Sequence, residues 1–145
     1  MTTELSKRKH LFAYGTLMCE DIMEEVSGDS FLCQQGLLHG YSRWCVVNEE
    51  YPAIAPDESG SVDGVVYMNV TDAAWDRLDR FEGEMYICIP VKIEFENGTS
   101  LIAETYVTRP EFKQRLNQEP WSFQTFLKKG KNCFQENYQG YQAIA

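Results

Sequence analysis

Apolar and polar positions alternate most regularly between residues 87 and 108. Every second residue from Ile87 to Phe95 is apolar, and this period of two places those side chains on one face of a β-strand. Asn97-Gly98 follows, and this dipeptide is a preferred two-residue hairpin turn. The segment Leu101–Thr108 is apolar enough to return as the partner strand. This part of the chain therefore predicts an antiparallel hairpin.

Helical periodicity appears in two segments. In the first, the apolar residues Met18, Ile22, Met23 and Val26 fall on one face, and Gly28 ends the run. In the second, Thr71 can cap a helix that runs to about Phe81. Both segments predict amphipathic helices whose apolar faces pack against a sheet.

Three further segments read as strands. His10–Tyr14 predicts a short first strand that Gly15 ends, and Val62–Val70 alternates like a strand. Phe31–Val47 is apolar and aromatic but interrupted by glycines, which predicts one or two bent strands with a kink or bulge. Tyr51–Gly60 contains two prolines and two acidic residues, so we expect a loop there.

The segment after Pro110 again favours helix, since its aromatic and aliphatic residues from Trp121 to Tyr138 lie roughly in helical register; Gly130 weakens this helix in its middle. The whole chain thus predicts an α+β fold, a small, mostly antiparallel barrel-like sheet with flanking helices. We expect one domain over residues 1–145, with a core at about 10–108 and a helical extension at about 109–145. The extension is expected to pack on its own barrel rather than to form a dimer surface.

Length, charge and cysteine content narrow the functional class. A chain of 145 residues can close a hydrophobic core on its own. The formal net charge of -9 argues against binding of nucleic acid or of an anionic membrane surface. The N-terminal residues 1–9 are polar, and no apolar run reaches membrane-spanning length, so we expect neither a signal peptide nor a membrane span. The five cysteines are widely spaced without a C-x-x-C pair, which favours reduced thiols and a cytoplasmic location.

Several kinds of catalytic site find no support. The two histidines, His10 and His39, are far apart and no carboxylate cluster has metal-ligand spacing, so we expect no metal ion. The sequence contains neither of the glycine-rich phosphate-binding motifs, G-x-x-x-x-G-K-[ST] and G-x-G-x-x-G. It also lacks the G-x-S-x-G motif that presents a nucleophilic serine. Cys19 follows the first strand closely and is formally a nucleophile, but a lone cysteine among apolar residues is more often part of the core.

Glu82 is the strongest candidate for acid–base chemistry. It follows Trp75 and Leu78 at spacings of seven and four, which places its carboxylate on the apolar face at the C-terminal end of the predicted helix. Burial and the negative end of the helix dipole both raise the pKa of such a carboxyl group toward the range of a general base. A solvated helix-end glutamate is nevertheless the commoner arrangement. Asp79 and Glu84 are expected to be surface acids of that kind, and Glu104 is a weaker second candidate.

The tetrapeptide Tyr14-Gly15-Thr16-Leu17 ends the first strand just before the first helix. Gly15 allows close approach of a ligand to the backbone, and exposed N–H groups in such a loop can bind negative charge. An ordinary strand-end turn has the same sequence features, so the residues alone leave both interpretations open.

Three ordered segments together indicate a family. Leu11–Leu17 opens the chain, Tyr51–Ile54 and Gly64–Tyr67 follow, and Leu78–Gly83 precedes Tyr86. This order and spacing resembles the γ-glutamyl cyclotransferase-like superfamily, in particular its short avirulence-induced-gene-like and γ-glutamylamine cyclotransferase-like branch. The resemblance covers roughly residues 10–108.

The resemblance implies a compact β-barrel with flanking helices and a pocket built from the Tyr-Gly-Thr-Leu loop. Position by position it implies Glu82 as the general acid/base and Tyr14, Gly15, Thr16 and Leu17 as substrate-binding residues. Tyr106 matches the family's tyrosine on the last barrel strand. The implied reaction is cyclisation of a γ-glutamyl amide to 5-oxoproline with release of an amine, without cofactor or metal.

Two other functions stay open at this level. The same scaffold could be a binding module without chemistry, or an amide hydrolase or acyltransferase that acts through Glu82. The sequence leaves open which amine is released and whether the protein is a monomer or a homodimer. The expected partner is a small-molecule γ-glutamyl substrate.

Overall fold

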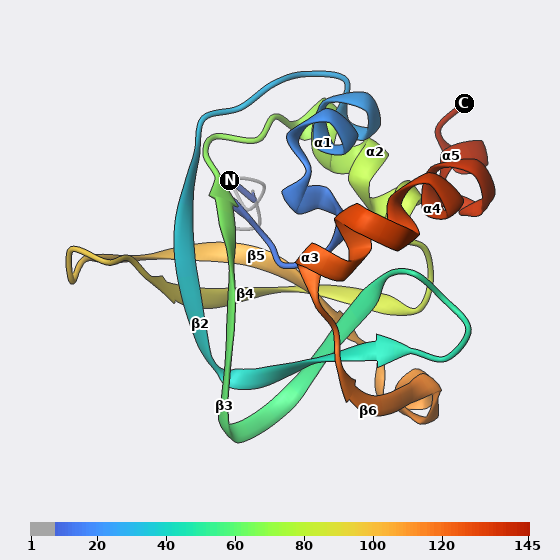
Figure 1. Cartoon of the computed structure of the whole chain (residues 1–145). Coiled ribbons are helices and arrows are strands. Elements are labelled where there is room, and N and C mark those ends of the chain that lie inside the picture. The colour runs from blue at the N-terminus through green and yellow to red at the C-terminus, as the bar shows by residue number, and fades with distance from the viewer. Residues whose placement is uncertain (1–7) are drawn as a thin grey trace.

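Residues 8–145, which the computed structural model describes, contain six strands of one sheet: β1 (Leu11–Ala13), β2 (Cys33–Val46), β3 (Pro52–Tyr67), β4 (Tyr86–Glu94), β5 (Ser100–Thr108) and β6 (Leu116–Pro120). Five of them close into a barrel in the order β3-β1-β5-β4-β2, because β2 also pairs with β3. Only β1 and β5 run parallel, and β6 extends the sheet beyond β2. The expected α+β fold, with a mixed and mostly antiparallel barrel, is confirmed (Figure 1).

The helices gather on one side of the barrel (Figure 1). They are α1 (Glu20–Ser27), α2 (Asp72–Glu82), α3 (Phe123–Thr125), α4 (Lys131–Asn137) and α5 (Gly140–Ala143), with a 3₁₀ turn at Thr16–Met18 and a π-helical turn at Phe126–Gly130. α2 begins where the sequence predicts, since the Thr71 hydroxyl accepts a hydrogen bond from the N–H of Ala74. α1 ends at Gly28 in the left-handed conformation, as the helical pattern predicts.

Alternation along the strands separates two hydrophobic clusters. On β1, Leu11 and Ala13 pack with the helices, whereas Phe12 points into a second cluster formed by strand residues such as Ile54, Val66 and Ile93. This is the two-sided arrangement expected of a strand, whose successive side chains leave opposite faces. The cluster on the helix side holds the pocket described below, and the other fills the barrel.

The expected loop at Tyr51–Gly60 is wrong, because all of its residues from Pro52 onward belong to β3. Pro52 is the first residue of that strand, where a missing N–H is tolerated, and Pro56 lies opposite Tyr41 beside an irregularity in the register. Residues 57–60 have no ladder partner on β2, so the strand turns a corner there. Proline therefore marks the start and the bend of a long strand rather than a loop.

Two smaller predictions also need correction. The β4–β5 hairpin forms, but its turn is longer than the two residues expected, and only Gly98 of the Asn97-Gly98 pair has positive φ. The Phe95 N–H donates to the carbonyl of Thr99, and the Phe95 carbonyl accepts from the N–H of Gly98. After Pro110, a 3₁₀ helix (Pro110–Arg115) and the short strand β6 precede the helices. The polar sequence of β6 carries no alternation that would have revealed it.

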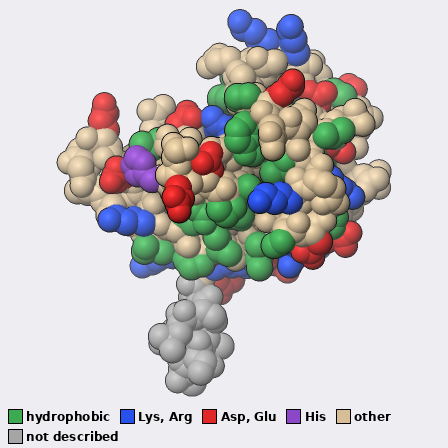
Figure 2. All heavy atoms as spheres, turned by 90° about the horizontal axis from the view of Figure 1, so that it is seen from below, with side chains coloured by type: hydrophobic (Ala, Val, Ile, Leu, Met, Phe, Trp, Pro, Cys, Tyr) green, Lys and Arg blue, Asp and Glu red, His purple; other side chains and the backbone are tan. Residues whose placement is uncertain are grey.

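The surface seen in Figure 2 mixes acidic, basic and apolar side chains without a broad region of one charge. Polar contacts such as that between Nε2 of His39 and Oε1 of Glu94, 3.0 Å apart, join exposed side chains of neighbouring strands.

Candidate active site

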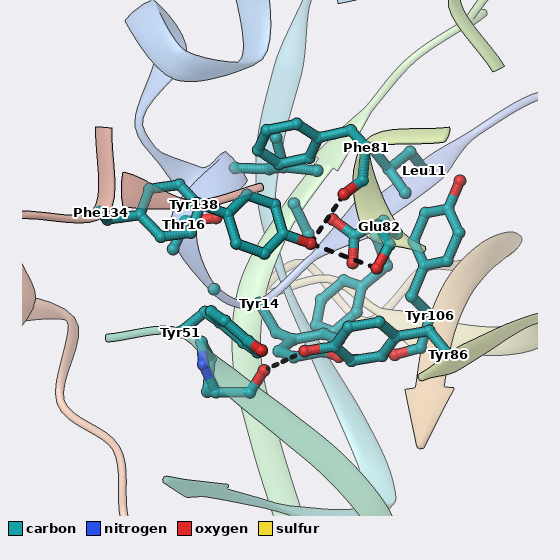
Figure 3. Close-up of a pocket in the computed structure, with 15 residues that line it drawn as sticks. Leu11, Tyr14, Thr16, Tyr51, Phe81, Glu82, Tyr86, Tyr106, Phe134 and Tyr138 are labelled. Carbon is teal, nitrogen blue, oxygen red and sulfur yellow. Dashed lines mark hydrogen bonds between the residues drawn. The ribbon is translucent and has the colours of Figure 1, made fainter. Parts of the chain in front are cut away.

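A cavity opens on the helix side of the barrel, and segments distant in sequence meet around it (Figure 3). The end of β1 and the following turn form one wall, and the last turn of α2 forms another. Strands β4 and β5, the start of β3 and helix α4 complete it. The lining residues are Leu11, Phe12, Ala13, Tyr14, Gly15, Thr16, Leu17, Tyr51, Pro52, Phe81, Glu82, Tyr86, Tyr106, Phe134 and Tyr138.

Glu82 is the one lining residue in this cavity with an acidic or basic side chain. It is the last residue of α2, a helix whose residues Trp75 and Leu78 are fully buried. The residue keeps some accessible surface where it borders the cavity, while its carboxyl group is surrounded by protein. Desolvation, with a smaller contribution from the nearby Asp79, raises the pKa of Glu82 to about 8. In residues 8–145 the structure records no hydrogen bond to this carboxylate, so a proton or a substrate group is its available partner.

The Tyr14–Leu17 turn lines the cavity, and it is held from several sides. The Tyr14 hydroxyl donates to the carbonyl of Tyr106 at 2.6 Å, and the Tyr67 hydroxyl donates to the carbonyl of Leu17 at 2.7 Å. A Cβ atom on Gly15 would lie 2.9 Å from Cγ and Cδ of Pro52. Glycine is therefore needed because the turn passes very close to β3.

Besides the Thr16 hydroxyl, the turn can offer a ligand its backbone N–H groups as donors. The carbonyls of Gly15 and Thr16 accept from Met18 and Cys19, which closes the 3₁₀ turn. The first N–H groups of such a turn have no acceptor within it. Gly15, Thr16 and Leu17 line the cavity, so a negatively charged ligand group bound at the turn would lie beside these donors.

Tyr106 lines the cavity with its ring, but its hydroxyl points away from it. That hydroxyl donates to Oδ1 of Asp79 at 2.7 Å, and Arg8 donates to both oxygens of the same carboxylate at 2.8–2.9 Å. Burial opposes ionisation of Asp79, yet the bonds from Arg8 and Tyr106 prevail and lower its pKa. Asp79 is exposed, as expected of a surface acid, and in addition it links β5 to α2 through Tyr106.

Three further tyrosines and Phe134 belong to the cavity, although no site role was predicted for them. The Tyr86 hydroxyl donates to the carbonyl of Pro52 at 2.8 Å, and that of Tyr138 donates to the carbonyls of Phe81 and Glu82 at 2.7 and 3.2 Å. Among the described residues, no hydrogen bond is recorded for the Tyr51 hydroxyl, and burial raises the pKa of Tyr51 to about 12. Tyr51 thus remains a neutral donor that lines the same cavity as Glu82 (Figure 3).

The other candidates lie outside the cavity. Glu104 does not line it, and its N–H pairs with the carbonyl of His10. Burial raises the pKa of the Cys19 thiol, which disfavours a nucleophilic thiolate. Neither His10 nor His39 borders the cavity. Within residues 8–145 no group of three or more His, Cys, Asp or Glu side chains is arranged to hold a metal ion.

Similar proteins share both the sequence pattern and the fold. "Protein AIG2 C" of Arabidopsis thaliana is 28% identical over 125 residues, which is 86% of this chain and 75% of that protein. A solution structure of an Arabidopsis thaliana protein superposes with a TM-score of 0.66 at 28% identity, over 90% of this chain and 89% of that one. A structure described as "Gamma-glutamyl cyclotransferase" has the same fold, with a TM-score of 0.62 at 20% identity over 83% of this chain and 86% of that one.

No helix within residues 8–145 is long and apolar enough to cross a membrane.

The sequence profile of the family described as "Gamma-glutamyl cyclotransferase, AIG2-like" matches residues 11–123, which include the turn, the end of α2 and the barrel strands around the cavity. The chain therefore belongs to the γ-glutamyl cyclotransferase, AIG2-like family.

Proposed function

We propose that the protein is a γ-glutamyl cyclotransferase in which Glu82 moves the protons. The observation that carries this proposal is a single carboxyl group with a pKa raised to about 8, in a largely aromatic cavity beside a turn whose first N–H groups have no acceptor within the turn. A carboxyl group with that pKa exchanges protons readily near neutral pH, which suits a general base that later acts as an acid. Family membership supports the reaction class.

The chemistry is an intramolecular aminolysis. The α-ammonium of a γ-glutamyl amide loses a proton to the ionised Glu82, and the resulting amine attacks the γ-carbonyl carbon. A C–N bond closes the five-membered lactam while the bond from that carbon to the leaving nitrogen breaks. Glu82 returns this proton to the leaving nitrogen and takes the second proton from the attacking nitrogen, which becomes the lactam N–H. Transfer of that second proton to the departing amine releases 5-oxoproline and an ammonium product and leaves Glu82 ionised. One carboxyl group serving both transfers contributes about 10²–10⁴-fold to the rate.

The surrounding residues would hold the substrate in its folded conformation. N–H groups of Gly15, Thr16 and Leu17 are proposed to bind negative charge on the substrate, and the ring of Tyr106 packs against the chain of the γ-glutamyl group. Tyr51 offers a hydroxyl to the same cavity. Such positioning matters because well-oriented intramolecular reactions gain about 7–11 kcal/mol over their bimolecular counterparts.

Product identity separates this proposal from its rivals. The wild-type protein would be incubated with a panel of γ-glutamyl amides that differ in the released amine, and the products identified by mass spectrometry. A cyclotransferase gives 5-oxoproline and the free amine, and the amide that is turned over fastest identifies the preferred leaving amine. Glutamate would instead indicate a hydrolase, and a new γ-glutamyl amide an acyltransferase. Ligand-dependent thermal stabilisation without any product would indicate a binding module.

A further inference from the structure

Arg43 on β2 reaches the back of the Tyr14–Leu17 turn. Its Nη1 donates to the carbonyl of Tyr14 at 2.8 Å and to the carbonyl of Asp63 at 2.9 Å, and its Nη2 donates to Oδ1 of Asp63 at 2.8 Å. The Arg43 side chain is 15% exposed, whereas that of Asp63 is 79% exposed. The guanidinium also lies over the ring of Trp121, 5.6 Å from its centroid. A largely buried cation is therefore held in place and donates to two backbone carbonyls, one of which belongs to the peptide group after Tyr14 in the turn.

That peptide group joins Tyr14 to Gly15, the glycine that lines the cavity. The described chain contains no cis peptide bond, so the Tyr14 carbonyl and the Gly15 N–H point in opposite directions within one plane. Arg43 does not line the cavity and takes the carbonyl on the far side of the turn. The Gly15 N–H consequently points away from Arg43, and Gly15 itself lines the cavity.

Arg43 also strengthens that N–H as a donor. A hydrogen bond from a cation to a carbonyl polarises the peptide, and bonds in such a chain reinforce one another. The cavity has no Lys, Arg or His of its own to receive an anionic group. The Tyr14–Gly15 peptide links the positive charge of Arg43, which lies outside the lining, to the cavity.

We propose that Arg43 is a positioning residue that orients and polarises the Gly15 N–H to bind the α-carboxylate of the γ-glutamyl substrate. This inference rests on the proposed function for the identity of the substrate. Because the carboxylate keeps its charge throughout the reaction, the interaction is equally strong in the ground and transition states. Loss of Arg43 should therefore raise KM and leave kcat nearly unchanged.

The first test needs no substrate. In ¹⁵N–¹H spectra of the full chain, the Gly15 amide of Arg43→Met should shift relative to the wild type, and its response to added 5-oxoproline should weaken at least about tenfold. The uncharged 5-oxoprolinamide should not discriminate between the two proteins. Asp63→Asn is the matched control, because it alters the exposed partner and leaves the bond from Arg43 to Tyr14 in place.

The second test is kinetic. Arg43→Met should raise KM for a γ-glutamyl amide at least about tenfold with less than about a threefold change in kcat, and Arg43→Lys should recover part of the loss. If Arg43→Met fails to fold, Arg43→Lys supplies both readouts. The lysine ammonium keeps the positive charge but lacks the planar set of donors with which the guanidinium bonds both Tyr14 and Asp63. An unchanged Gly15 amide with unchanged KM in a folded variant overturns the inference, even if the wild type makes 5-oxoproline. A wild type without turnover whose Gly15 amide still responds to carboxylate through Arg43 would overturn the proposed function alone.

Discussion

The protonation state of Glu82 is set mainly by burial, because no cation among the lining residues offsets its charge. The pKa is about 8 in the folded protein against 4.5 in the unfolded chain. Folding therefore favours the protonated form of Glu82. The stabilisation that comes from binding this proton is complete below pH 4.5 and is lost as the pH rises to about 8. A tenfold change in a proton-binding constant corresponds to about 1.4 kcal/mol, which makes the ionised carboxylate destabilising by at most about 5 kcal/mol.

Glu82→Gln should remove this cost without changing the shape of the side chain. We expect the variant to unfold at a Tm several degrees above the wild type at pH 9 and at nearly the same Tm at pH 4.5. Thermal unfolding across this pH range is the measurement, with Glu84→Gln as the exposed control. Parallel Tm curves for Glu82→Gln and the wild type would show that Glu82 titrates normally.

Two tyrosines of the C-terminal segment differ in how their hydroxyls are used. Tyr138 donates to the carbonyls of Phe81 and Glu82, whereas the buried Tyr141 hydroxyl has no partner in the described part of the chain. Tyr138→Phe should therefore lower the free energy of unfolding by about 1 kcal/mol, and Tyr141→Phe should leave it unchanged or raise it. Denaturant titrations of both variants test the pair. Equal losses in the two would contradict the assigned contacts.

At the scale of elements, the turn after β1 and the start of β3 touch at one point, where Gly15 meets Pro52. Gly15→Ala places a methyl carbon 2.9 Å from the Pro52 ring, so the turn must shift. Misplacement of substrate-binding groups by about 1 Å can cost on the order of 10²-fold in rate. We expect kcat/KM for 5-oxoproline formation to fall by at least about tenfold in a protein that still folds.

Thr71→Ala serves as the opposite case. It removes the hydroxyl that caps α2, at the end of the helix away from Glu82. The expected cost is about 0.5–2 kcal/mol of stability with kcat/KM nearly unchanged. If Gly15→Ala and Thr71→Ala lowered Tm and kcat/KM in the same proportion, the effect at Gly15 would be general instability rather than displacement of the turn.

The sequence predicts the elements that carry the site better than it predicts their surroundings. Glu82 is found through its spacing from Trp75 and Leu78, because a regular helix fixes which residues share a face. The contribution of Tyr138 has no such signal: it depends on the C-terminal helices meeting the end of α2, where Gly140 lies so close that a Cβ atom would contact the carbonyl of Phe81. Contacts between elements far apart in sequence are tertiary, and periodicity carries no information on them.

At the scale of the whole molecule, the C-terminal segment packs into the same hydrophobic cluster as the barrel and α2. Trp121, Phe126 and Phe134 are buried, and Phe134 and Tyr138 also line the cavity. Truncation after Pro120 should therefore abolish cooperative unfolding as well as turnover, because burying each of these aromatic side chains contributes roughly 3 kcal/mol. Circular dichroism during thermal unfolding is the measurement. A truncated chain that unfolds cooperatively and stays active would make residues 121–145 a separate appendage.

Direct comparison of 5-oxoproline formation by the wild type, Glu82→Gln and Glu84→Gln tests the central claim most sharply. All three would be assayed by mass spectrometry at about pH 8, where general-base catalysis by Glu82 operates, on the best γ-glutamyl amide, after circular dichroism has verified folding. We expect Glu82→Gln to lose about 10²–10⁴-fold in kcat while retaining substrate affinity, and Glu84→Gln to match the wild type. A folded Glu82→Gln protein that forms 5-oxoproline at the wild-type rate would remove Glu82 from the mechanism.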